Sequence, residues 1–454
     1  MIKPSFILLL IAISAHLPAC AQPLTPELIA IEHVNVISMD NDTIDREQTV
    51  LIRGRRIETV GNAADTDIPA GATRVNGRGK YLLPGLAEMH GHIPGAKSAE
   101  KDVERFMWLN VLNGITTVRG MLGDDIQLQW RREIARGERL GPQLFLAGDS
   151  INGKSVTSKD DAFRRVTEQR AAGYDLLKIH PGLSWENFQQ VAKSAAAENM
   201  PFAGHIPTDV GLERALNAGI SSVEHLDGYI DGLRRPGFDN PQDFWGITVV
   251  DDVDESRIAL IVQQTLAAGA WVTPTNTLYE TFLGLESVDN MLDREDLRYW
   301  PQKQVDVWVE QVSTFRKESG EMLAQRQRVL ELRARLIREL QATETGILLG
   351  ADAPQIFNVP GFATIREVEN LVANGLSEYQ ALKAGTVNPA RYFGLENSFG
   401  QVKEGMRADL ILVDDNPLED ISKLRQPYAV VLAGRWFSRE MIEEKLASLK
   451  VSGR

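Results

Sequence analysis

Short apolar segments that alternate with amphipathic stretches fill the middle of the chain, and this alternation restricts the fold more than any other feature. Eight apolar segments occur, at residues 82–90, 114–121, 142–149, 175–180, 201–205, 221–226, 271–277 and 346–352. Helical periodicity lies between them, for example at residues 162–172, 185–198, 210–218 and 255–268. Eight repeated strand–helix units predict an α/β protein with a (β/α)8 TIM barrel.

Both ends of the chain have a different pattern from the middle. Before the barrel, "LIAIEHVNVISMD" and "TVLIRGRRIETVG" are typical of β-strands separated by turns. After it, "DLILVDD" and "YAVVLAGRWF" return to the same pattern. We therefore expect a small β-sandwich domain built from both chain ends, residues 22–84 and 396–440, with the barrel at residues 85–395 inserted between them.

The first residues have the layout of a secretory signal. Residues 1–21 carry an early lysine, an apolar core and small residues at their end, so we expect export to the periplasm or the medium. Two outcomes stay open. Cleavage after Ala21 would release a soluble protein, whereas the segment Leu17–Cys20 resembles a lipoprotein signal that would leave a lipid anchor on Cys20. Cys20 is the only cysteine, so no internal disulfide is expected, and no later stretch is apolar enough for a transmembrane span.

The net charge restricts the class of partner. The chain carries a formal charge of −13 at pH 7, which argues against nucleic acid, because such proteins present basic patches. A small-molecule substrate is the expected partner, and the oligomeric state is left open.

Polar residues follow the predicted barrel strands at the point where each strand ends. The chain has only seven histidines, yet four of them occur at such positions. Alternate residues of a strand share a face, so the pair in "EMHGH" can bind one ion together. Active sites of such barrels lie at the carboxyl ends of the strands. These positions predict a metal site formed by His90, His92, Lys178, His205, His225 and Asp352.

Each of these residues alone would be weak support for a metal site. A lone histidine at a strand end is usually a hydrogen-bonded structural residue, a lone lysine extends to the surface, and a lone aspartate can cap a helix. The combination, in order and on five different strands, favours metal binding.

The motifs "HGH", "LLKIH", "AGH", "EHL" and "GAD" resemble those of the amidohydrolase superfamily, in particular its secreted imidazolonepropionase-like and prolidase-like branch. The resemblance implies two divalent metal ions, with zinc the expected metal. His90 and His92 would hold one ion with Asp352, His205 and His225 the other. Lys178 would bridge the ions as a carbamate formed with carbon dioxide. Gly120 departs from the pattern, because many relatives have an aspartate there.

The expected reaction is hydrolysis of an amide-like C–N bond in a dipeptide, an N-acyl amino acid or a cyclic amide. A hydroxide that bridges two divalent ions is nucleophilic at neutral pH, and Asp352 would transfer its proton to the leaving group. Two alternatives remain. The same site would serve an esterase, a lactonase or a phosphotriesterase, and a non-catalytic barrel could bind metal or ligand only.

Three further residues are candidates for contact with substrate. Tyr229 could donate a hydrogen bond to the carbonyl oxygen or be an ordinary loop tyrosine. His180 shares a face with Lys178 and could reach substrate or support a ligand. Arg119 could bind a substrate carboxylate, although a buried salt bridge is its more common role. Arg119 and His180, together with Arg234 and Arg235, suggest a carboxylate beside the scissile bond.

Overall fold

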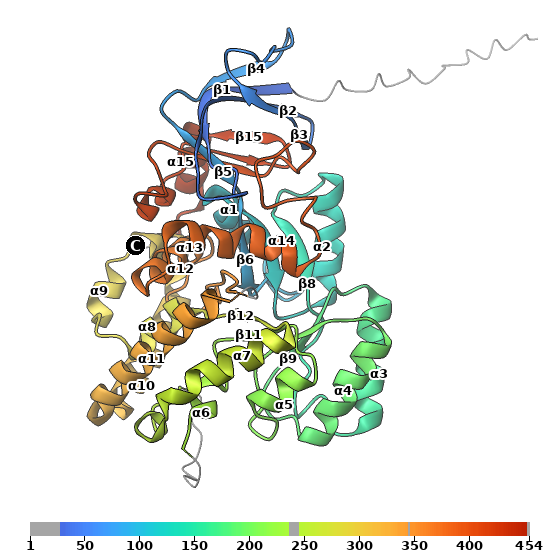
Figure 1. Ribbon diagram of the computed structural model, residues 1–454, viewed down its shortest axis with the longest axis vertical. Helices are drawn as coiled ribbons and strands as arrows, with labels where there is room; N and C mark the ends of the chain where they lie inside the picture. Colours follow the sequence, from blue (N-terminus) through green and yellow to red (C-terminus); the bar gives the residue numbers. More distant parts are fainter. Residues whose placement is uncertain (1–27, 236–244, 344–345, 452–454) are drawn as a thin grey trace, which may run out of the picture.

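The computed structural model describes residues 28–235, 245–343 and 346–451. The predicted signal peptide at residues 1–21 and the lipid-anchor position Cys20 lie outside these ranges. Strands from both chain ends, blue and red in Figure 1, lie at one end of the molecule, next to parallel strands surrounded by helices. In the part of the chain that the structure describes, no helix combines the length and the apolar character that crossing a membrane requires.

An eight-stranded sheet joins the two ends of the chain. Its order is β15-β14-β13-β5-β1-β2-β3, with β4 paired to β1. β5 and β13 connect the two ends through antiparallel pairing from Leu410↔Pro84 to Val413↔Tyr81. The strands are β1 Leu28–Val36, β2 Asp45–Arg53, β3 Arg56–Asn62, β4 Thr73–Asn76, β5 Tyr81–Pro84, β13 Leu410–Val413, β14 Ala429–Leu432 and β15 Arg435–Ser438.

Apolar residues of β13 are buried on both faces of this sheet. Leu410 and Leu412 belong to a core formed by the sheet itself, whereas Ile411 and Val413 belong to the large core of the barrel region. Successive side chains of a strand point to opposite faces, so one strand contributes to two cores. The structure assigns one sheet here, and the two-layered sandwich is not confirmed.

Seven of the eight predicted central strands are present as parallel strands in two sheets. One sheet has the order β6-β7-β8 and the other β12-β11-β10-β9. Nearly all of their residues are buried, as expected of parallel strands covered by helices. The strands are β6 Leu86–Gly91, β7 Ile115–Gly120, β8 Gln143–Leu146, β9 Leu177–Ile179, β10 Phe202–Gly204, β11 Ser222–Glu224 and β12 Trp271–Thr273.

The eighth predicted strand, residues 346–352, is not assigned as a strand. It pairs with its neighbours only through isolated parallel bridges, Val272↔Ile347 on one side and Gly91↔Ala353 on the other. A third bridge, Ala147↔Leu176, links the two sheets. The chain leaves the extended conformation at Asp352, where φ is +61°, so the ladder is too short for a regular strand. The assigned sheets therefore do not form one closed barrel.

Helices follow most of the parallel strands, and the four that the sequence predicted correspond to α3, α4, α5 and α7. Their capping is partly local: the Ser158 side chain accepts a hydrogen bond from the backbone of Asp161 at the start of α3. The helices are α1 Glu100–Leu112, α2 Asp125–Arg136, α3 Lys159–Ala172, α4 Trp185–Ala197, α5 Leu212–Asn217, α6 Tyr229–Gly232, α7 Ile258–Ala268, α8 Asn276–Leu283, α9 Val288–Leu292, α10 Gln302–Glu318, α11 Leu323–Gln341, α12 Phe362–Ala373, α13 Glu378–Gly385, α14 Val387–Tyr392 and α15 Arg439–Leu449.

Candidate active site

The histidine pair of "EMHGH" lies at the carboxyl end of β6. His90 is buried. Its Nε2 lies 3.3 Å from Nζ of Lys178, a residue of β9. His92 follows the strand directly and is one-quarter exposed, with Nε2 3.0 Å from Oδ1 of Asp352. Four of the predicted ligands thus lie together: His90, His92, Lys178 and Asp352.

Glu88, the first residue of the same motif, ties this region to the eighth segment. Its buried carboxylate accepts hydrogen bonds from the backbone of His90 at 2.8 Å, from the backbone of Ala351 at 3.0 Å and from the hydroxyl of Thr364 at 2.7 Å. A side chain at Gly350 would meet the backbone nitrogen of His90 at 2.9 Å. Glu88 and Gly350 therefore hold Asp352 close to the histidine pair.

The remaining two predicted histidine ligands complete the cluster. The His205 ring, after β10, lies 4.7 Å from the His225 ring, after β11, and His225 lies 4.6 Å from His90 between ring centroids. Ligand atoms of His90, His225 and Asp352 all lie within 4.8 Å of one another, and all three residues are buried. Oδ1 of Asp352 is buried and accepts no hydrogen bond from the described residues. Such a donor set suits a divalent cation.

Hydrogen bonds orient three of the histidine rings through the same atom. Nδ1 of His90 lies 2.6 Å from Glu224, and Nδ1 of His205 lies 2.6 Å from Asp227. Nδ1 of His225 lies 2.8 Å from the hydroxyl of Thr275, which donates its own proton to the Pro274 carbonyl. Each acceptor favours a proton on Nδ1 and leaves the lone pair on Nε2, which is the tautomer that binds a metal.

These supporting residues were missed by the sequence analysis, although a signal for two of them exists. Glu224 directly precedes His225, and Asp227 follows it by two positions, both within "VEHLD". Each orients a histidine from a different strand, and such a pairing across strands cannot be seen in a linear motif.

The site combines neutral imidazoles with anionic carboxylates. Burial lowers the pKa of His90 to about 4 and that of Lys178 to about 8. Burial by itself would raise the pKa of Asp352, but the charges of His90 and His92 hold it below its usual value. Burial by itself would also raise the pKa of Glu224, but the positive charge of Arg119 holds that pKa below its usual value.

Arg119 lies between the parallel strands, where it forms a salt bridge. The side chain is fully buried, and Nη2 donates to Glu224 at 2.8 Å. Nε donates to the Met89 carbonyl at 2.6 Å, and Nη1 to the Ser222 hydroxyl at 2.8 Å. All three nitrogens have protein partners, so this placement does not support binding of a substrate carboxylate.

Tyr229 also lies away from the cluster. Its side chain is fully buried, and its hydroxyl forms a 2.9 Å hydrogen bond with Thr265 of α7. Burial raises its pKa above the usual value. The structure therefore gives no support to the predicted hydrogen bond with a substrate carbonyl, because the hydroxyl points into the packing between α6 and α7.

His180, in contrast, lies at the site. Its ring is 5.0 Å from that of His205, and its Nδ1 lies 2.7 Å from the Ser150 hydroxyl. Burial and the charge of Lys178 lower its pKa, so the ring is neutral. The His180 ring can therefore contact a substrate that binds beside His205.

The arginine pair after β11 does not reach the cluster. Arg234 donates to Asp231 at 3.2 Å, and Arg235 donates to the Val253 carbonyl at 3.3 Å. With Arg119 also engaged, only His180 of the residues behind the predicted substrate carboxylate lies at the cluster.

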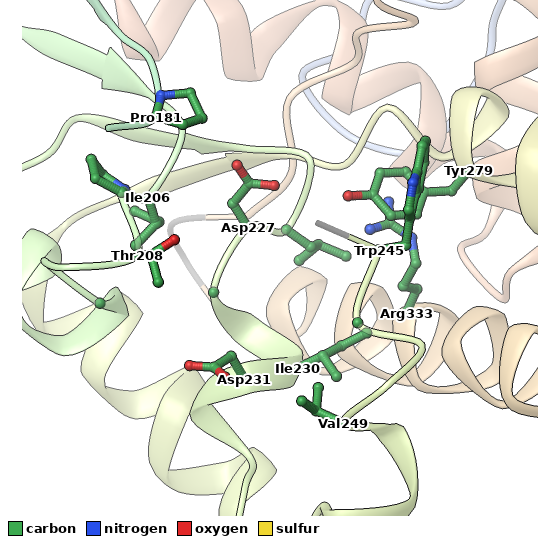
Figure 2. A pocket seen from close by; sticks show the side chains of 15 residues that line it. Pro181, Ile206, Thr208, Asp227, Ile230, Asp231, Trp245, Val249, Tyr279 and Arg333 are labelled. Carbon is green, nitrogen blue, oxygen red and sulfur yellow. The ribbon is translucent and has the colours of Figure 1, made fainter. Parts of the chain in front are cut away.

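A pocket of about 240 Å³ opens beside Asp227. Figure 2 shows Asp227 and Asp231 among its lining side chains, with Trp245, Tyr279 and Arg333 grouped on one side. Aliphatic residues cover much of the remainder: Ile206, Leu226, Ile230 and Val249. Trp245 and Tyr279 meet edge to face, with ring centroids 5.1 Å apart. The pocket thus presents an aromatic and aliphatic surface next to the His205 side of the cluster.

Arg333 of α11 holds the loops that carry the cluster. It donates to the carbonyls of His225 and Pro274, both at 2.7 Å, and its guanidinium lies 3.4 Å from the Tyr279 ring centroid. The φ angles are +64° at His225 and +49° at Thr275, a region that is unfavourable for residues other than glycine. Backbone strain of this kind is common at functional sites, where surrounding contacts maintain it.

Comparison with known proteins agrees with this geometry. The model of a family described as "Amidohydrolase family" matches residues 81–437. Ochratoxinase from Aspergillus niger is 23% identical over 410 residues, covering 85% of this chain and 81% of that protein. Among solved structures, a bottromycin amidohydrolase has a TM-score of 0.71 at 19% identity, covering 93% of this chain and 91% of that one. A Xaa-Pro dipeptidase with bound methionine in the active site has a TM-score of 0.66 at 20% identity, covering 91% and 100%. At these identities, the likeness to solved structures shows the fold alone.

Proposed function

The chain belongs to the amidohydrolase family and is a hydrolase acting on C–N bonds, and from this premise we propose that it is an exported enzyme with two divalent ions that cleaves an amide-like bond. The observation that carries the proposal is the buried cluster of His90, His225 and Asp352, whose ligand atoms lie within 4.8 Å of one another. His92, His205 and Lys178 surround this cluster.

Six residues would hold the two ions, which we take to be zinc. His90, His92 and Asp352 would hold one, and His205 and His225 the other. Lys178, buried 3.3 Å from Nε2 of His90, would lie between them as a carbamate. Three histidines already present an Nε2 lone pair, and Asp352 has a buried oxygen without a hydrogen-bond partner. This donor set fits divalent cations.

When bound, the two ions would lower the pKa of water and polarise the scissile carbonyl. The protein would then position substrate and move protons. Asp352 would accept the proton lost by the attacking water and return it to the leaving nitrogen. Its pKa lies below the usual value, so it is ionised at neutral pH. His180 would orient the substrate from the side of His205.

The pocket beside Asp227 suggests which substrates are accepted. Its walls are aromatic and aliphatic, and the Arg333 guanidinium that also lines it already donates to the carbonyls of His225 and Pro274. We therefore propose a substrate with an uncharged apolar or aromatic group on one side of the scissile bond. A dipeptide, an N-acyl amino acid or a cyclic amide with such a group would fit.

Elemental analysis and turnover measurements test this proposal together. We expect two divalent ions per chain after expression with added metal, and hydrolysis of amides with an apolar group next to the scissile bond. The panel should pair each amide with the matching ester or lactone. Faster ester cleavage would indicate an esterase. One ion or fewer per chain would contradict the binuclear site, and no turnover on any member with two ions present would favour a binding protein.

Export needs its own test, because it is supported only by the composition of residues 1–21. Mass spectrometry of the protein from its native host would identify the mature N-terminus. We expect either Gln22 or a lipid-modified Cys20. An intact N-terminus at Met1 would contradict export.

A further inference from the structure

We propose that a second site, an arginine-lined cavity between the eight-stranded sheet and α2, binds a ligand that carries two or more phosphate charges. The cavity has a volume of about 440 Å³. Its lining comes from the β2–β3 turn, α2 and the segment after it, the start of β8, the residues before β13 and the β14–β15 turn. None of these residues belongs to the candidate active site.

The charge of this cavity is opposite to that of the whole chain. The chain has a net charge of −13, yet no aspartate or glutamate of the described residues lines the cavity. Six arginines from separate segments do: Arg55, Arg56, Arg131, Arg139, Arg407 and Arg435. Such a concentration of one sign inside a concave surface attracts anions.

Three of the six arginines are neutralised by carboxylates. Arg131 lies 2.6 Å from Asp175, Arg139 lies 2.8 Å from Glu133, and Arg407 lies 2.5 Å from Asp409. These pairs anchor the side chains at the cavity wall. Among the described residues, the other three arginines have no such ion pair.

Arg55, Arg56 and Arg435 form no ion pair with a carboxylate of the described residues. Arg55 donates one hydrogen bond to the Ala135 carbonyl at 2.8 Å, and Arg56 donates one to the Gly405 carbonyl. Arg435 contacts the Phe437 ring at 5.8 Å. All three are exposed, and most of their N–H groups are free to bind a ligand. The planar guanidinium matches phosphate oxygens in pairs.

Backbone packing holds these three arginines in place. The Ala408 nitrogen donates to the Arg55 carbonyl at 2.9 Å, and the Gly434 nitrogen donates to the Ala408 carbonyl at 2.9 Å. A side chain on Gly434 would lie 1.6 Å from the Gly54 carbonyl oxygen, so the two turns are in close contact. The backbone that carries these arginines is therefore held by contacts between the two turns.

The inner wall of the cavity is apolar. It includes Ile134, Leu140, Leu144 and Leu432. A ligand that fits both parts has phosphate groups at the arginines and a less polar body against this wall. Soluble sugar phosphates and anionic phospholipid headgroups share this chemistry.

Fructose 1,6-bisphosphate, with neutral fructose as its control, is a suitable soluble probe for isothermal titration calorimetry on the full chain. We expect saturable binding of the bisphosphate only, weakened by salt because the charges are exposed to solvent. The double variant Arg55→Ser/Arg435→Ser should bind at least about 10-fold more weakly, since two charge-assisted phosphate contacts are lost. The matched control is Arg46→Ser/Arg132→Ser, which removes two exposed arginines outside the cavity. Circular dichroism would verify that both variants are folded.

Vesicle co-sedimentation distinguishes the two sources of phosphate. Cardiolipin vesicles, whose headgroup carries two phosphates, are compared with phosphatidylcholine vesicles, for the wild type and both double variants. Loss of cardiolipin binding in Arg55→Ser/Arg435→Ser alone would identify a lipid headgroup. Binding of the bisphosphate without vesicle binding would identify a soluble ligand. The proposal is overturned if neither probe binds, or if the cavity variant binds as tightly as the control variant.

Discussion

Replacing Glu224 by glutamine should weaken both the fold and the metal site, because this carboxylate serves both. Oε1 accepts from Arg119 at 2.8 Å and from Ser222 at 2.6 Å, and Oε2 lies 2.6 Å from Nδ1 of His90. Arg119 and Glu224 are both 0% exposed. Glu224→Gln removes the only carboxylate paired with Arg119 among the described residues and places an amide N–H₂ against a donor.

The size of each effect follows from these contacts. A buried guanidinium left without its partner costs about 3–5 kcal/mol. Loss of a carboxylate that orients a metal-binding histidine typically costs about 10–100-fold in metal affinity. We therefore expect a lower free energy of unfolding in the metal-free protein and, separately, weaker binding of the ion held by His90.

Two assays separate these effects. Urea unfolding with a chelator present measures the salt bridge without metal, and competition with a chromogenic chelator measures metal affinity. Asp227→Asn is the matched control, because Asp227 orients His205 but forms no ion pair with an arginine among the described residues. It should lose metal affinity with only about 1 kcal/mol of stability. In Arg119→Met/Glu224→Gln, part of the stability should return, because the unpaired charge is gone. If Glu224→Gln unfolded within about 1 kcal/mol of wild type and bound metal normally, the reasoning would be refuted.

Three further predictions concern single residues. Asp352→Asn should reduce kcat by about 10²–10⁴-fold in a folded protein, because asparagine cannot transfer a proton; near-normal kcat with full metal occupancy would exclude that role. Lys178→Ala should lose the second ion and nearly all activity, both partly restored by propionate in the vacated position; two ions and normal turnover without added acid would contradict the bridge. Tyr229→Phe should lower the free energy of unfolding by about 1 kcal/mol, because the hydrogen bond to Thr265 is lost, and should leave kcat unchanged. A large fall in kcat would show that Tyr229 takes part in the reaction.

The cluster of candidate metal ligands shows how far local pattern can predict a site. Alternation along a strand places His90 and His92 on one face, and parallel strands share their carboxyl ends. These two rules require no tertiary information, and they bring His90, His205, His225 and Asp352 to the same edge. The structure places these residues together, while the ions and the carbamate remain proposals.

The predicted substrate contacts that the structure does not support involve residue types that are compatible with several partners. Arg119 and Tyr229 both follow or end short strands near ligand positions, which made them plausible contacts for substrate. Their partners, Glu224 and Thr265, are 105 and 36 positions away in sequence. Nothing local to either residue indicates whether its polar group points into a cavity or into the core.

The sequence by itself determined the order of strands and helices, the family and the residue types at the strand ends, because periodicity and chain order are local properties. Only the tertiary structure decided which histidine nitrogen faces the site, which charges are neutralised and where cavities lie. Hydrogen bonds such as His90–Glu224 join residues 134 positions apart, and the arginine-lined cavity gathers its charges from separate segments. Electrostatics depends on distance in space rather than on distance along the chain, so these features exist only once the chain has folded.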